Sequence, residues 1–163
     1  MKKLFCLIFF VFSLNFSVVS AVGDVIVMPK KETQEDKQNQ AVAEFEAAKK
    51  MSQFALYSTD DYRDIIIQNL ALVAVDRVQD YKKILARVSG SIESSSDSDA
   101  KYCSSFTEAI LVERVAILEA YINFAKCYSA KDAVGCKNYN SQVKYRGERA
   151  AKLRQEFFEV FGF

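Results

Sequence analysis

The sequence predicts an all-α protein, an antiparallel four-helix bundle of long helices that follows a cleaved signal peptide. Pro29 is the only proline of the 163-residue chain, so no proline interrupts a helix after residue 30. Only four glycines follow it, far fewer turn residues than an all-β chain of this length needs. Apolar residues recur at helical spacing in four segments, and these segments are the expected helices.

The first 21 residues have the layout of a secretory signal peptide. Lys2 and Lys3 precede an apolar run over residues 4–19, and the small residues Ser20 and Ala21 follow at the cleavage site. The run is short and polar residues interrupt it, which argues against a stable membrane span. We therefore expect an exported protein, periplasmic or secreted, with a bacterial-type signal.

Cleavage at this site leaves 142 residues, enough for one domain with a hydrophobic core. They carry 20 basic and 21 acidic side chains, and this balance gives no reason to expect a nucleic-acid partner. We expect residues 22–32 to form an extended leader and residues 33–163 to form the helical bundle.

Capping residues and apolar spacing set the boundaries of the first two expected helices. Thr33 with Asp36 resembles a capping box and opens the first helix, at residues 34–56. An acidic stretch opens the second, at residues 60–88, where one apolar seam extends over three heptads. The seam consists of Ile67, Leu70, Ala74, Val78, Tyr81, Leu85 and Val88. Gly90 is expected to end this helix.

The segment at residues 89–100 is rich in serine and aspartate, and this composition predicts a flexible connector. A second capping box, at residues 105–108, opens the third expected helix, at residues 106–128. The fourth begins within residues 138–141 and ends near Val160. The second and third helices are the longest apolar ones, so we expect them to form the central pair of the bundle.

Three cysteines remain after cleavage, in a compartment that permits disulfides. Cys103 and Cys127 lie at opposite ends of one expected helix, about 36 Å apart at about 1.5 Å per residue, so they cannot be bonded. Cys127 and Cys136 flank the turn between the third and fourth helices, and we expect them to form a disulfide. Cys103 is then a free or intermolecular thiol at a helix N-terminus, where the pKa of a thiol falls. Burial under the connector or Phe163 is the alternative.

The chain contains no histidine, which removes Ser-His-Asp and Cys-His catalysis and the usual zinc and haem sites. It also has no glycine-rich phosphate loop and no CxxC motif. We therefore expect no cofactor, no metal site and no enzymatic activity. An enzyme that uses paired carboxylates or Cys103 is the alternative.

Two groups of charged side chains are candidate contacts. Arg114 lies beside the apolar stripe of its helix, and we expect an interhelical ion pair with Asp76 or Asp80 that fixes helix register. A ligand-binding arginine is the alternative. The fourth helix carries a candidate basic contact face for an acidic protein or an anionic membrane surface, or else a solvated face. Its residues are Lys144, Arg146, Arg149, Lys152 and Arg154.

Together these features favour an exported, non-enzymatic helical protein that acts by binding another protein. It would be an accessory subunit of an envelope or secretion assembly, an adaptor or a secreted effector. Two other functions fit the same features: a carrier that holds a small apolar ligand in a cavity between helices, and a periplasmic holdase chaperone. A bond between two copies of Cys103 is the expected route to an oligomer.

Overall fold

The computed structural model describes residues 32–162, which are entirely α-helix and short turns. Its helices are α1 (Gln34–Ser58), α2 (Tyr62–Ile67), α3 (Ala71–Ser94), α4 (Ser98–Ser129) and α5 (Ala133–Phe161). The predicted all-α helical bundle is confirmed, with α2 as a short addition to four long helices. The predicted signal peptide and, apart from Glu32, the predicted leader lie outside the described residues.

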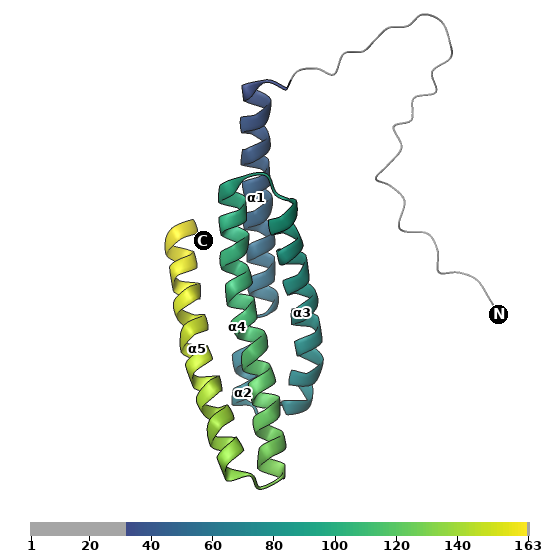
Figure 1. The fold of residues 1–163 in the computed structure, drawn as a ribbon, viewed down its shortest axis with the longest axis vertical. Helices are drawn as coiled ribbons and strands as arrows, with labels where there is room; N and C mark the ends of the chain where they lie inside the picture. Colours follow the sequence, from purple (N-terminus) through teal and green to yellow (C-terminus); the bar gives the residue numbers. More distant parts are fainter. Residues whose placement is uncertain (1–31, 163) are drawn as a thin grey trace, which may run out of the picture. The chain divides into compact units, whose positions relative to one another are not determined.

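Helix α4 is the centre of the bundle, and α1, α3 and α5 each pack along it (Figure 1). Helices α3 and α5 run antiparallel to α4, whereas α1 runs in the same direction as α4. Among the described helices, the backbone of α5 closely approaches only α4, while α1 also meets α3. The prediction of a central pair is therefore wrong. Helix α4 alone contacts all the other helices, so it is buried around most of its circumference while α3 faces solvent on one side.

The second predicted helix is interrupted, since residues 68–70 separate α2 from α3. Asn69 adopts a left-handed backbone conformation (φ 57°), which asparagine tolerates better than most residues and which an α-helix cannot include. Beyond the break, the predicted seam is buried at Ala74, Val78, Tyr81 and Val88. Ile67 and Leu70, which come before α3 begins, are exposed.

The predicted flexible connector at residues 89–100 is mostly helical, and only residues 95–97 lie between α3 and α4. Gly90 lies inside α3 and does not end it. Two serines of this segment contact α4: Ser89 donates to Glu108, and Ser91 donates to Ser104 (3.2 Å). Some serines of this segment therefore make contacts between helices, while Ser94, Ser96 and Ser98 are exposed.

Capping side chains explain where the long helices begin. Thr33 forms the predicted capping box with Asp36. Asp97 and Asp132 cap α4 and α5, and each accepts from the backbone N–H three residues further on (2.7 and 3.0 Å). Because these caps precede the predicted ones, the last two helices begin at residues 98 and 133 and not at residues 106 and 138.

The core is richest in aromatic side chains where α1, α4 and α5 meet. Phe157 is fully buried there and packs against Phe106 and Phe161, with ring centroids 6.1 and 4.9 Å apart. A second cluster joins α2, α3 and α4 around Tyr81 and Leu118. The first turns of α1 extend past the other helices and carry exposed polar side chains (Figure 1). None of the helices in residues 32–162 combines the length and the apolar composition that a membrane span needs.

Candidate functional site

A buried arginine on α4 closes the C-terminal end of α1. Arg114 is 1% exposed, and its Nη1 donates to the backbone carbonyl of Leu56 (2.6 Å) and to the hydroxyl of Thr59 (2.5 Å). The last carbonyls of an α-helix have no partner within the helix, and the helix dipole favours a cation at this end. Arg114 satisfies one of these carbonyls, so it stabilises the point at which α1 ends.

Arg114 also joins α4 to the turn between α1 and α2. Its Nη2 lies 3.1 Å from Asp60 Oδ1, and Arg154 of α5 forms two contacts with the same carboxylate (3.2 and 3.3 Å). The Arg114 guanidinium stands over the ring of Tyr62, 5.2 Å from its centroid. Burial lowers the pKa of Arg114 below its ordinary value, while Tyr62 and Asp60 raise it. An arginine stays charged under such a shift. One buried cation therefore joins α4 to the end of α1, to the turn that follows it and to α2.

The prediction that Arg114 pairs with Asp76 or Asp80 is wrong. Asp76 is exposed, and Asp80 pairs with Lys83 of the same helix (3.0 Å). Helix α3 turns Tyr81 into the core, and this orientation places the neighbouring aspartates on the solvent side. The acidic partner of Arg114 comes instead from the turn after α1.

Tyr81 extends these polar contacts to α3. It is buried, and its hydroxyl donates to Asp61, which also pairs with Arg77 (3.4 Å). Burial and this hydrogen bond raise the pKa of Tyr81 above its ordinary value. The phenol therefore stays a neutral donor that ties α3 to the start of α2.

Glu113, the residue before Arg114, holds α5. Its carboxylate is buried and accepts from Arg146 Nη1 (3.1 Å) and Arg149 Nε (3.2 Å). Adjacent residues of a helix project about 100° apart, so the two buried charges reach different neighbours. Glu113 faces α5 and Arg114 faces the end of α1.

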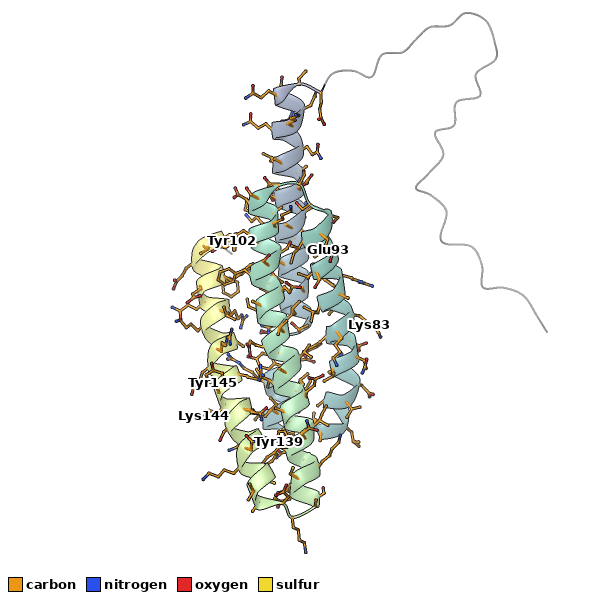
Figure 2. All side chains as sticks on the ribbon, in the orientation of Figure 1. Lys83, Glu93, Tyr102, Tyr139, Lys144 and Tyr145 are labelled. Carbon is orange, nitrogen blue, oxygen red and sulfur yellow. The ribbon has the colours of Figure 1, made fainter. Side chains whose placement is uncertain are left out.

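Most residues of the predicted basic contact face of α5 form ion pairs with other residues of the chain. Its ion pairs are Arg146 and Arg149 with Glu113, Arg154 with Asp60, and Lys152 with Glu156 (3.7 Å). Of the five predicted residues, only Lys144 forms no ion pair within residues 32–162, and its side chain is exposed (Figure 2). Most of this face positions α5 on the rest of the bundle.

All three cysteines of the described part of the chain are free thiols. Cys127 and Cys136 lie on the adjoining ends of α4 and α5 and are not bonded to each other, so the predicted disulfide is absent. Helix α5 begins before Cys136 and fixes the direction of its side chain. As a result, Cys136 Sγ lies 4.0 Å from the carbonyl oxygen of Phe124.

Cys103 is a free thiol, as predicted, but not at a helix N-terminus. It lies five residues after the first residue of α4, is fully buried against α1, and has its Sγ 3.5 Å from the hydroxyl of Ser52. Burial raises the pKa of this thiol. The thiol is buried, as the alternative interpretation expects, and Ser52 of α1 lies against it, so a reactive or intermolecular Cys103 does not fit the folded bundle. Phe163 lies outside the described residues.

A surface carboxylate ties α1 to the turn between α3 and α4. Glu44 accepts from the hydroxyls of Ser95 (2.8 Å) and Ser96 (2.9 Å) and from the backbone N–H groups of Ser96 (2.8 Å) and Asp97 (3.0 Å). These hydrogen bonds, above all that from Ser95, lower the pKa of Glu44 to about 2. The contact was missed in the sequence because the donors lie 51 or more residues further along the chain.

The break between α2 and α3 exposes a group of apolar side chains that we name the apolar corner. Its members are Ile67, Leu70, Leu72 and Val75. Ile67 is 76% exposed and Leu72 is 86% exposed. Exposed carboxylates lie one helical turn away on the same segments, Asp64 before Ile67 and Asp76 after Leu72. The sequence signal for this surface was the polar pair Gln68-Asn69 inside an otherwise apolar run.

Two surface grooves are open to solvent. The larger, of about 450 Å³, has Arg63, Arg154 and Phe158 in its wall, and the smaller, of about 230 Å³, lies beside Glu44. Within residues 32–162, no three acidic or cysteine side chains gather closely enough to hold a metal ion. A comparison of the chain with protein-family models, curated proteins and solved structures found no match.

Proposed function

We propose that the chain is an exported, non-enzymatic helical protein that acts by binding another protein at the apolar corner. The observation that carries this proposal is the high exposure of Ile67 and Leu72. Single apolar residues are common on protein surfaces, but these belong to a run that the turn between α2 and α3 presents together. Removing such side chains from water is the main source of affinity in protein contacts.

The charge around the apolar corner suggests the chemistry of the partner. Asp64 and Asp76 form no ion pair with any residue of the described chain. A partner that places lysine or arginine beside these carboxylates gains specificity and association rate. We therefore expect an apolar contact with basic residues at its edge.

The interior of the bundle supports a binding scaffold over a ligand carrier. Arg114 and Glu113 are both paired within the chain, and the two grooves named above are open to solvent. Such contacts hold the helices that present the apolar corner in one arrangement. An adaptor, an accessory subunit of an envelope assembly and a secreted effector are all consistent with that role.

Site-specific crosslinking in the source cell tests the partner. A photoreactive residue in place of Leu72 is expected to yield a defined crosslinked protein. The control carries the photoreactive residue in place of Lys83, further along the exposed side of α3. With that partner purified, Leu72→Glu is expected to weaken binding by about tenfold or more, because an interface anchor becomes a buried charge. Crosslinking that is equal at both positions, or unaltered binding by Leu72→Glu, would reject the proposal.

Export is tested separately by the intact mass of the protein recovered from each cell fraction. A mature chain that starts at Val22 in the periplasm or the medium supports the signal peptide. An uncleaved chain that stays with the membrane contradicts it. The two experiments fail independently, because the apolar corner lies far in sequence from the cleavage site.

A further inference from the structure

The turn between α4 and α5 forms one extremity of the helical bundle and carries unpaired positive charge (Figure 1). We define the lysine tip as four exposed lysines with two exposed apolar side chains: Lys126, Lys131, Lys137, Lys144, Tyr128 and Val134. Tyr128 is 74% exposed and Val134 is 81% exposed. The only acidic residue between positions 126 and 144 is Asp132, whose carboxylate caps α5.

The lysine tip differs from the arginines higher on α5. Arg146 and Arg149 are held by Glu113, whereas none of the four lysines forms an ion pair within residues 32–162. Val134, Lys137 and Lys144 recur at spacings of three and seven, so they line one side of α5. Figure 2 shows Lys144 and Tyr145 on the side of α5 that faces away from α4. Positive charge is therefore concentrated on a protruding surface that no part of the described chain covers.

We propose that the lysine tip binds an anionic lipid surface. Lysine is depleted in the centres of protein interfaces, whereas basic residues interspersed with tyrosine and aliphatic side chains suit the headgroup region of a membrane. Tyr128 places an apolar ring and a polar hydroxyl at such a boundary, and Val134 offers a small apolar contact. Because these lysines are exposed to water, the attraction is additive and sensitive to salt. This contact does not depend on the partner at the apolar corner.

Vesicle co-sedimentation of the mature chain tests the proposal. Vesicles of phosphatidylglycerol and phosphatidylcholine in equal parts are compared with vesicles of phosphatidylcholine alone. Neutralising one lysine near an anionic surface lowers partitioning about fivefold, so K131Q/K137Q is expected to bind about 25-fold more weakly than the wild type. The matched control K83Q/K101Q removes the same charge from exposed lysines of α3 and of the first turn of α4, and it is expected to bind like the wild type.

Three results would overturn the proposal. The first is equal binding of the wild type to anionic and neutral vesicles. The second is an equal loss in K83Q/K101Q, which would show a response to net charge and not to the lysine tip. The third is binding of soluble polyglutamate at the lysine tip without vesicle binding, which would assign the surface to an acidic protein. Circular dichroism of each variant confirms that the helices are intact.

Discussion

Two contacts of opposite kinds hold helix α1 on the rest of the bundle. At its C-terminal end, the buried Arg114 binds the Leu56 carbonyl and Thr59 out of contact with water. Nearer its N-terminal end, the carboxylate of Glu44 accepts four hydrogen bonds at the surface from the turn between α3 and α4. A buried charge is costly to leave unpaired, whereas water replaces much of a lost surface contact. The two contacts therefore differ in strength and in sensitivity to pH.

Replacing Arg114 is expected to have the largest effect. Arg114→Ala removes the donor to the Leu56 carbonyl and one of the two arginine partners of Asp60, and it leaves a cavity between α4 and the end of α1. We expect the free energy of unfolding to fall by about 3–5 kcal/mol, because a buried carbonyl loses its donor and a large buried side chain leaves a cavity. Urea denaturation followed by circular dichroism measures this change.

Arg63→Ala is the control for this prediction. Arg63 is an exposed arginine of α2 whose Nε donates to the hydroxyl of its neighbour Tyr62 (2.9 Å). Substitution of an exposed residue of this kind changes stability by about 0.5 kcal/mol or less. If Arg114→Ala lowers the free energy of unfolding no more than Arg63→Ala does, the buried cation does not stabilise the end of α1.

Glu113→Gln removes the other buried charge of α4. We expect it to lower the free energy of unfolding by less than Arg114→Ala does. The amide can accept from Arg146 or Arg149 but loses the charge that attracts both. Because both arginines are partly exposed, they can turn to water, and we expect a loss of about 1.5–3 kcal/mol. The same urea titration measures it. A loss greater than that of Arg114→Ala would mean that α5, and not α1, depends more on the buried charges.

Periodicity predicted the helical class and most of α3 because one side of each long helix must be buried. The same reasoning failed where a contact depends on distant residues. The serines of residues 89–100 match the composition of a linker, yet Ser89 pairs with Glu108 across a helix interface. Composition does not distinguish a solvated small side chain from one that forms a contact between helices.

The charged contacts were the least predictable part of the chain. Arg114 stood out because it lies beside an apolar stripe, but its partners depend on where α1 ends in space. That end lies 54–58 residues away, at Asp60 and the Leu56 carbonyl. The basic residues of α5 resembled a free surface because the sequence does not show that Glu113 is buried. A single sequence shows which residues are charged but not which of them form ion pairs in the folded protein.

The smallest expected effect concerns the surface contact of α1 at Glu44 and is measured through Cys103. This thiol lies beneath α1, near Ser52, so a reagent reaches it only when α1 separates from α4. In Glu44→Gln, we expect a thiol reagent to label Cys103 several-fold faster than in the wild type at neutral pH. The partly exposed Cys127 and Cys136 are expected to react rapidly in both proteins. Mass spectrometry of the alkylated peptides resolves the three sites.

The pH dependence distinguishes a carboxylate contact from a simple loss of packing. The folded protein lowers the pKa of Glu44 from its ordinary 4.5 to about 2. A carboxylate whose pKa is lowered by folding contributes its full stabilisation above about pH 4.5. This stabilisation is lost as the pH falls towards 2. The stability difference between wild type and Glu44→Gln should therefore be constant near neutral pH and shrink across that interval. A difference that persists unchanged at pH 2 would show that α1 is held there by packing and not by the Glu44 carboxylate.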